Sequence, residues 1–259
     1  MLKFAANLTM MFTEWPFLDR FGAAADTGFQ AVEYLFPYDH PPEAIASRLQ
    51  RHGLTQALFN TPPGDWAAGE RGMAALPGRF EELKASVQTA LVYAQATGAK
   101  RLHLMAGIAN RDNPAAAASY ETAVTYAAEQ LAEHGIELLL EPINARSMPG
   151  YFLNDYPYAE ALIKRLGLRN LRLQFDIFHR QIMHGDVSAA LTRLMPIIGH
   201  VQVASVPLRN EPNTGELNDG HIFAMLEKLN YGGFIGCEYN PRAGTLAGLG
   251  WLHDAGAKQ

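Results

Sequence analysis

The chain has 259 residues, of which 48% are hydrophobic, and its 26 acidic and 21 basic residues give a formal net charge of -5. This length and apolar content are enough for one large core, and the mild negative charge argues against a nucleic-acid-binding surface, which is normally basic. Cys237 is the only cysteine, so no internal disulfide can form. The sequence contains no uninterrupted apolar run of about eighteen residues, so no membrane span is expected.

Short apolar segments alternate with helix-like segments from one end of the chain to the other. The apolar segments are bounded by Gly, Pro, Asn or the helix-like segments, as is typical of buried parallel strands. Strands are expected at residues 3–8, 31–36, 54–59, 101–105, 136–141, 171–176, 200–203 and 234–238. Helices are expected at residues 15–27, 41–52, 78–97, 114–134, 156–166, 187–195 and 220–229, with a short terminal helix at 246–253.

This alternation of strands and helices predicts a parallel sheet, and eight strand–helix units predict that the sheet closes into a barrel. The expected fold class is therefore α/β, with a single (β/α)₈ TIM-barrel domain over residues 1–259. An open doubly wound sheet is the competing fold, but no Gly-rich phosphate-binding turn follows the first predicted strand. In such a barrel the chemistry is expected at the C-terminal ends of the strands, in the loops that lead to the helices.

The loop after the third predicted strand, residues 60–77, is longer than the roughly two to six residues usual in α/β units. It contains Asn60, Trp66 and Arg71. Long loops on the active face commonly form lids or substrate walls. We therefore expect this loop either to close over a pocket or to pack against a second subunit of a homo-oligomer.

Four predicted strands in the second half of the chain each end on, or pass through, one oxygen-bearing side chain: Glu141, Asp176, Gln202 and Glu238. In one barrel these side chains converge at the same end. Three acids gathered there would repel one another unless a cation lies between them, and an amide in so apolar a strand needs a partner. Carboxylate and amide oxygens suit a hard divalent cation. Solvated acids and a Gln bonded to the backbone are the alternative interpretation.

Four further residues are candidates for substrate binding. His179 lies three residues after Asp176, at the start of the following loop, from which it could reach a metal, its water or a substrate oxygen. His103 lies inside the fourth predicted strand and points either into the core or into the pocket. Arg209 follows the seventh strand and suits bidentate capture of a substrate carboxylate, unless it is a solvated loop residue. Asn60, at the start of the long loop, completes this set.

Several motifs together resemble the hydroxypyruvate isomerase family, which includes the 2-oxo-tetronate isomerases and belongs to the xylose-isomerase-like barrels. The resemblance covers nearly the whole chain, from Phe4 to about Trp251. The matching stretches are residues 4–8 with 11–12, 36–38, 64–72, 141–144, 211–212 with 214–216, and 236–239. The chain departs from the family pattern at Asn240, where a Lys is usual, and at residues 217–219.

The resemblance implies that Glu141, Asp176, Gln202 and Glu238 hold Mg²⁺ (or Mn²⁺), with Glu141 and Glu238 as the catalytic proton-transfer pair. It implies a metal-binding isomerase of carbohydrate acid metabolism that interconverts hydroxypyruvate and 2-hydroxy-3-oxopropanoate (tartronate semialdehyde). Isomerisation of the four-carbon 2-oxo-tetronate is the alternative. The expected partner is a small 2-oxo or hydroxy acid.

Other functions on the same barrel predict different features. A ketose 3-epimerase would use a similar metal and glutamate pair with longer polyols. An apurinic-site endonuclease would need several metals with many His ligands and a basic surface for DNA, whereas this chain has nine His, few of them at predicted strand ends, and a net negative charge. A non-catalytic sugar-acid-binding barrel would bind ligand without turnover. Because the N-terminus lacks the basic head and apolar stretch of a signal peptide, a cytoplasmic protein without nucleic-acid or membrane partners is expected.

Overall fold

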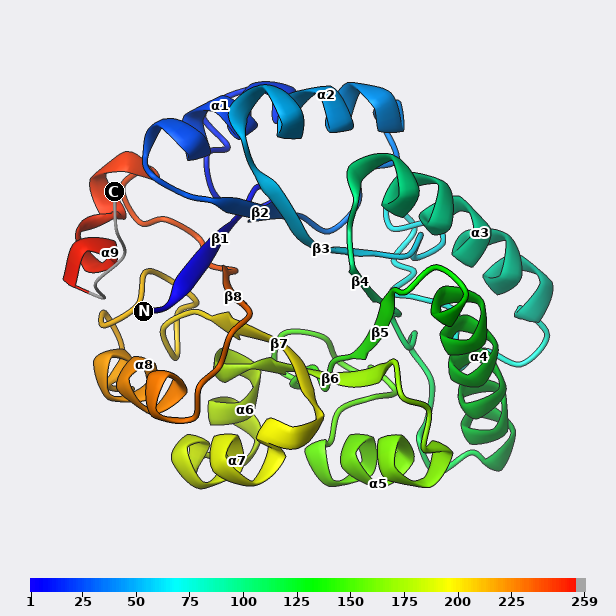
Figure 1. Cartoon of the computed structure of the whole chain (residues 1–259). Helices are drawn as coiled ribbons and strands as arrows, with labels where there is room; N and C mark the ends of the chain where they lie inside the picture. The colour runs from blue at the N-terminus through cyan, green and yellow to red at the C-terminus, as the bar shows by residue number, and fades with distance from the viewer. Residues whose placement is uncertain (255–259) are drawn as a thin grey trace.

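The computed structural model describes residues 1–254, and within them eight parallel strands close into a barrel surrounded by helices (Figure 1). Each strand pairs with its sequence neighbours, and β1 pairs with β8 to close the ring. The strands are β1 (Lys3–Asn7), β2 (Ala31–Glu33), β3 (Thr55–Asn60), β4 (Arg101–His103), β5 (Glu137–Leu140), β6 (Leu171–Asp176), β7 (Ile198–Val203) and β8 (Phe234–Cys237). The predicted (β/α)₈ TIM barrel is confirmed. The predicted domain also includes residues 255–259, which lie outside the described residues.

The helices occupy the expected places, with one addition. They are α1 (Phe17–Asp26), α2 (Pro42–His52), α3 (Phe80–Thr97), α4 (Pro114–Ala132), α5 (Tyr156–Leu166), α6 (Ile177–His184), α7 (Val187–Leu194), α8 (Asp219–Lys228) and α9 (Gly250–Asp254). Short 3₁₀ turns lie at Met195–Ile197 and Leu246–Gly248. The predicted terminal helix over 246–253 was wrong in part, because it is divided into the second of these turns and α9.

Two further predictions need correction. The strand expected at 31–36 ends at Glu33, so Glu33 lies at a strand end rather than inside a strand. Helix α6 was not expected, and His179 lies in its first turn rather than in a loop. The helix begins there because the Asp176 carboxylate accepts hydrogen bonds from the backbone N–H groups of Phe178 and His179, at 2.7 and 3.4 Å.

The inside of the barrel changes from apolar to polar along its axis. Ala5, Ala31 and Ala57 form a small apolar cluster within the barrel. One step further along the paired strands, Asn7 of β1 lies opposite Glu33 of β2, and both side chains are buried. Larger apolar side chains fill the space between the barrel and its surrounding helices. The polar end of the interior is the end at which the four predicted ligand residues converge.

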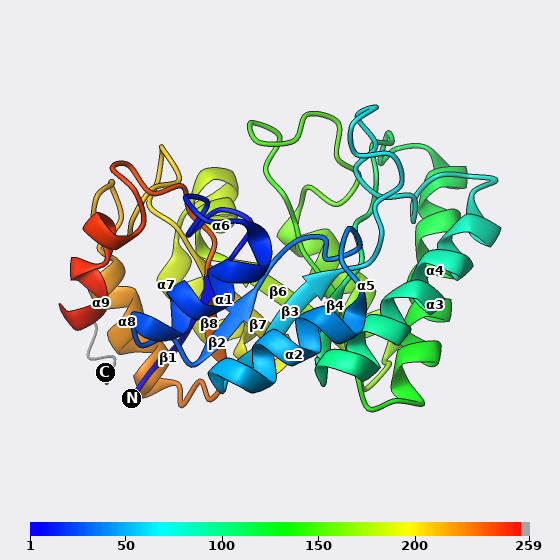
Figure 2. The same cartoon turned by 90° about the horizontal axis from the view of Figure 1, so that it is seen from above.

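Loops at the C-terminal ends of the strands build walls above this polar interior. In Figure 2 the loops that follow β3 and β5 rise on the side of the barrel opposite the N-terminus. The first of them is fixed at its base, because the backbone N–H of Ala75 donates to the Ala106 oxygen at 2.7 Å. Gly72 has a φ of +104°, and a Cβ there would lie 2.3 Å from the Met105 oxygen, so only glycine permits this close approach.

The described helices include none that is both long and apolar enough to span a membrane.

Candidate active site

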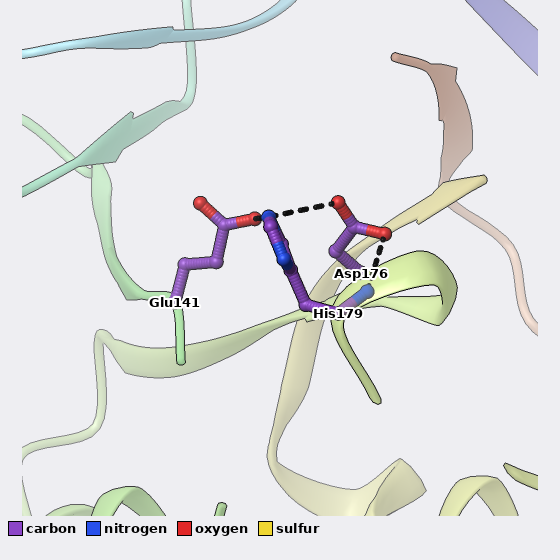
Figure 3. A group of neighbouring side chains, drawn as sticks. All are labelled: Glu141, Asp176 and His179. Atoms are coloured by element: carbon purple, nitrogen blue, oxygen red, sulfur yellow. Dashed lines mark hydrogen bonds and ion pairs between the residues drawn. The ribbon is translucent and has the colours of Figure 1, made fainter. Parts of the chain in front are cut away.

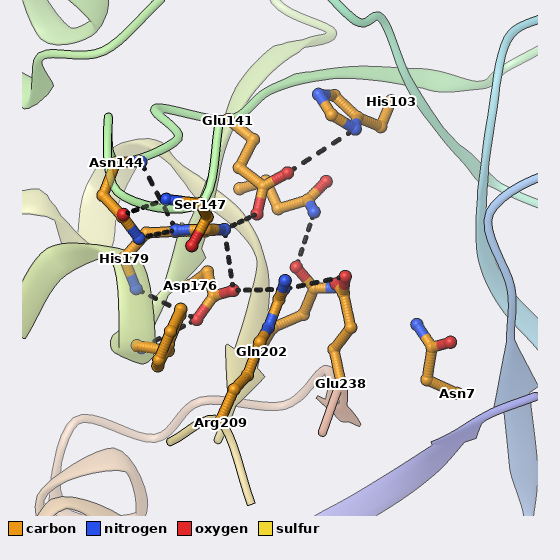
Figure 4. A network of polar contacts seen from close by, with 12 residues as sticks. Asn7, His103, Glu141, Asn144, Ser147, Asp176, His179, Gln202, Arg209 and Glu238 are labelled. Carbon is orange, nitrogen blue, oxygen red and sulfur yellow. Dashed lines mark hydrogen bonds and ion pairs between the residues drawn. The ribbon is translucent and has the colours of Figure 1, made fainter. Parts of the chain in front are cut away.

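A cavity of about 260 Å³ opens at the C-terminal end of the barrel. It is smaller than the roughly 300–1,000 Å³ of sites for drug-sized ligands and suits a small metabolite. Seven of the eight predicted site residues line it: Asn60, His103, Glu141, His179, Gln202, Arg209 and Glu238. The eighth, Asp176, is fully buried beside His179 and Arg209. The fold thus brings together side chains from β3 to β8 and their loops, and Figure 4 shows those from β4 onward.

Glu141, Asp176 and His179 each offer one ligand atom within 4.8 Å of the others (Figure 3). Glu141 directly follows β5 and precedes Pro142, Asp176 ends β6, and His179 is in the first turn of α6. These side chains come from two neighbouring strands and the helix that continues the second strand. The two carboxylates of this group could hold a cation, and the predicted ligands Gln202 and Glu238 line the same cavity.

Glu141 is buried without a hydrogen-bonded partner among the described residues. Its Oε1 atom is inaccessible and unpaired, and its oxygens lie 3.7 Å from His103 Nδ1 and 3.9 Å from His179 Nε2, too far for normal hydrogen bonds. Burial, followed by the negative charges of Glu238 and Asp176, raises the pKa of Glu141 well above its ordinary value. A buried carboxylate left unpaired in this way has the character of a ligand or a proton carrier.

Arg209 bridges two further acids of the site, Asp176 and Glu238. Its Nη2 lies 2.9 Å from Glu238 Oε1 and 3.4 Å from Asp176 Oδ2. Burial raises the pKa of Glu238 to about 7 despite this contact, and Asp176 adds to the rise. Burial likewise raises the pKa of Asp176, although Arg209 and the two capping N–H groups oppose the shift. The Arg209 guanidinium also lies over the Phe178 ring, 5.1 Å from its centroid.

The orientation of His179 is set by Asn144. The backbone N–H of Asn144 donates to His179 Nδ1 at 3.4 Å, and the Asn144 side-chain nitrogen lies 2.6 Å from the same atom. Burial, together with the charge of Arg209, holds the pKa of His179 well below its ordinary value. The neutral ring therefore carries its proton on Nε2, which faces Asp176 Oδ2 at 3.5 Å. His179 acts here as a donor toward the cavity rather than as a free acceptor.

His103 is the second buried imidazole of the site. Burial lowers its pKa to about 3, so the ring is neutral near pH 7. Its Nε2 atom has no hydrogen-bonded partner among the described residues, and its Nδ1 lies on the side of Glu141. Asn60, which ends β3, also lines the cavity, while its backbone oxygen accepts from the Tyr38 hydroxyl at 2.6 Å.

Gln202 belongs to a network that the sequence analysis missed. Its Oε1 accepts from Gln174 Nε2 at 2.6 Å, and its Nε2 donates to Glu238 Oε2 at 2.5 Å and to Glu33 Oε1 at 2.8 Å. Glu33 also accepts from Asn7 Nδ2 at 3.0 Å and from His200 Nε2 at 2.7 Å. A partial signal was present, since Glu33 is the one acid in the apolar segment expected at residues 31–36.

The charges of the site do not balance. Four carboxylates, Glu33, Glu141, Asp176 and Glu238, are buried within it. Glu33 is paired with His200, Arg209 contacts Asp176 and Glu238, and Glu141 has no hydrogen-bonded partner among the described residues. With His103 and His179 neutral, ionised Glu141, Asp176 and Glu238 would leave an excess of two negative charges beside Arg209. An excess of this kind is costly in a poorly solvated site, and a divalent cation would remove most of it. The donor set, with the unpaired Glu141 Oε1, therefore fits a hard divalent cation.

Comparison with known proteins identifies relatives over nearly the whole chain. The family model for the xylose isomerase-like TIM barrel matches residues 21–255. A 2-oxo-tetronate isomerase from Cupriavidus necator is 53% identical over 97% of this chain and 98% of that protein. The hydroxypyruvate isomerase of Escherichia coli is 43% identical over 97% and 98% of the two chains. A crystal structure described as AP endonuclease, family 2, from Brucella melitensis has a TM-score of 0.95 at 49% identity and covers 98% of this chain and 99% of that one.

Proposed function

The chain belongs to the xylose isomerase-like TIM barrel family and is an isomerase, and we propose that it interconverts a short 2-oxo acid and its isomer through an ene-diolate. The proposed substrates are hydroxypyruvate, which would give 2-hydroxy-3-oxopropanoate, and its four-carbon analogue 2-oxo-tetronate. Relatives named for these activities are 43% and 53% identical to the chain. The proposal depends above all on the two buried glutamates, Glu141 and Glu238, that line one small cavity.

The reaction moves a carbonyl group between C2 and C3. A proton leaves C3 and a proton is returned to C2, while the hydroxyl proton on O3 passes to O2, so atoms and charge balance. Glu141 follows β5 and Glu238 follows β8, with β6 and β7 between them, so the two carboxylates approach the cavity from different sides (Figure 4). Carboxyl groups whose pKa values are raised above the ordinary range are suited to take and return protons, and burial raises the pKa of both glutamates. We assign these two residues as the proton-transfer pair.

The surrounding side chains have distinct proposed roles. His179 holds a proton on Nε2 and would donate it in a hydrogen bond to a substrate oxygen. Arg209 places positive charge beside the region in which negative charge develops on the substrate. His103 and Asn60 line the wall and would contact the substrate directly.

We further propose that Glu141, Asp176, Gln202 and Glu238 hold Mg²⁺ (or Mn²⁺). The excess of buried carboxylates and the unpaired Glu141 Oε1 support this proposal. When bound, such a cation would supply positive charge that stabilises negative charge developing on substrate oxygens. The Gln202 amide now turns its nitrogen toward Glu238, so it would have to rotate for its oxygen to become a ligand.

The test is turnover of hydroxypyruvate and 2-oxo-tetronate, measured side by side by NMR in D₂O, with Mg²⁺ and with a chelator. We expect chelator-sensitive turnover with incorporation of deuterium at carbon. Glu141→Gln and Glu238→Gln should keep the fold by circular dichroism but lose about 10³-fold or more in kcat. Glu137→Gln is the matched control, because Glu137 is a half-exposed carboxylate at the start of β5, outside the cavity lining. Turnover of neither acid by the unaltered protein would overturn the proposal.

The same assays separate the alternative functions. Nicking of a duplex that contains an abasic site would indicate an endonuclease, the activity named for the Brucella melitensis structure. Turnover of free ketohexoses above that of either acid would indicate a ketose 3-epimerase. Binding of the acids without turnover in the presence of Mg²⁺ would indicate a binding protein.

A further inference from the structure

The following inference rests on the proposed function and concerns how the site selects an acid. The proposed substrates carry a carboxylate, and a cavity that already contains several buried acids needs a cation to receive another one. Two arginines line the cavity, Arg71 and Arg209. Arg209 already contacts Glu238 and Asp176, so much of its charge is used within the protein.

Arg71, in contrast to Arg209, is available to bind a carboxylate of the substrate. Its Nη1 donates to the backbone oxygens of Trp66 and Glu70, at 3.0 and 2.7 Å. Among the described residues no carboxylate forms an ion pair with Arg71, and neither its Nε nor its Nη2 has a hydrogen-bonded partner. The adjacent acid, Glu70, is turned away, because its carboxylate pairs with Arg79 at 2.6 Å and accepts from the backbone N–H of Asp65.

The guanidinium of Arg71 is also held in a fixed plane. It lies over the Trp66 ring, 3.9 Å from the centroid, and the Trp66 ring in turn packs against Phe36 at 5.0 Å. The next residue, Gly72, makes the close approach to Met105 that fixes the loop to its neighbour. An arginine stacked on an aromatic ring and held by backbone oxygens keeps one edge free for a planar, bidentate acceptor such as a carboxylate.

We propose that Arg71 binds the carboxylate of the substrate and is the residue by which the site selects 2-oxo acids over uncharged ketoses. Trp66 supports this role by positioning the guanidinium. The role of Arg209 is then confined to the reacting end of the site, beside Glu238 and Asp176.

The first measurement is binding of tartronate, a three-carbon hydroxy diacid, by calorimetry in the presence of Mg²⁺. Arg71→Gln is expected to raise the Kd about 100-fold, the loss expected of a bidentate charge-assisted contact, and Arg71→Lys by less, since a lysine offers charge without the planar fork. Arg146→Gln is the matched control, because Arg146 is an exposed arginine on the loop after β5 that does not line the cavity. This control should leave the Kd unchanged.

Steady-state kinetics supply a second readout. Arg71→Gln should raise KM for hydroxypyruvate and for 2-oxo-tetronate far more than it lowers kcat. The inhibition constant of dihydroxyacetone, in which a hydroxymethyl group replaces the carboxylate of hydroxypyruvate, should not change. Equal effects of Arg71→Gln and Arg146→Gln on tartronate binding, or equal weakening of tartronate and dihydroxyacetone, would overturn the role of Arg71. If the unaltered protein turned over neither acid, the proposed reaction would fail, and the tartronate titration would still decide whether Arg71 binds a carboxylate.

Discussion

Substitution of Glu33 tests whether the buried hydrogen-bond network that joins Glu33 to Gln202 and Glu238 supports the site. The Glu33 carboxylate is almost fully buried and accepts hydrogen bonds from Asn7, His200 and Gln202. In Glu33→Gln the side chain keeps its shape but loses its charge, and its new NH₂ group can accept from none of these donors. A hydrogen bond to a charged group contributes roughly 1.5–3 kcal/mol, and an unsatisfied buried donor costs about 1–3 kcal/mol. Because the three bonds share one carboxylate, we expect a net loss of about 2–4 kcal/mol in the free energy of unfolding.

Urea unfolding followed by circular dichroism measures this loss. The control is Glu137→Gln, since Glu137 is half-exposed and paired with Arg101 on the surface, where an ion pair contributes at most about 1 kcal/mol. A second variant, Gly236→Ala on β8, should displace the same carboxylate, because its Cβ would lie 2.2 Å from Glu33 Oε2. Both Glu33→Gln and Gly236→Ala should also lower kcat more than they raise KM, since Gln202 links Glu33 to Glu238. If Glu33→Gln were as stable as the Glu137→Gln control, the reasoning would be refuted.

Three further predictions concern the cation, a ligand residue and the loop. Burial raises the pKa of Glu238 from an ordinary 4.5 to about 7, so in chelator the folded protein should lose up to about 3 kcal/mol of stability as the pH rises from 5 to 8. Mg²⁺ should then raise the thermal midpoint more at pH 8 than at pH 5, and equal shifts would contradict this. In chelator at pH 8, Glu141→Gln should unfold at the same or a higher urea concentration than the unaltered protein, because it removes a buried acid that has no partner; a loss above about 1 kcal/mol would contradict it. Gly72→Ala should lower the free energy of unfolding by about 1–3 kcal/mol and weaken substrate binding, because the new Cβ would meet the Met105 oxygen. Gly69→Ala is the control and should lower the free energy of unfolding less, because Gly69 has a similar φ but no atom within 4 Å of the new Cβ.

The barrel could be predicted because its strands are short apolar segments with clear boundaries. Most predicted element bounds agree with the structure to within about two residues. The convergence of Glu141, Asp176, Gln202 and Glu238 also followed from strand order alone, since the C-terminal ends of parallel strands share one end of a barrel. Both inferences need only the order of strands and helices along the sequence and the rule that the C-terminal ends of parallel strands share one end of a barrel.

What the sequence could not supply were the pairings between side chains from distant strands. Glu33 was placed inside an apolar segment that was expected to continue to residue 36, so its position at a strand end went unnoticed. The bond between Glu33 and His200 joins residues 167 positions apart, and no local pattern indicates it. Helix α6 was missed for a related reason, because Asp176 was considered as a ligand and not as the residue that caps the next helix. The two oxygens of this carboxylate have different partners, because Oδ1 accepts from the backbone of α6 and Oδ2 faces Arg209.

Glu33 and Glu141 show why burial alone does not identify a functional acid. Both are glutamates at the ends of barrel strands, and both are almost fully buried. Glu33 accepts three hydrogen bonds, and the missing side chain of Gly236 makes room for its carboxylate. Glu141 lines the cavity and has no hydrogen-bonded partner among the described residues. A fully paired buried carboxylate stabilises the fold, whereas an unpaired one lowers stability and keeps its oxygens free for a cation, a proton or a substrate. From the hydrogen bonds that each glutamate makes, we therefore propose that Glu33 supports the site and that Glu141 takes part in its chemistry.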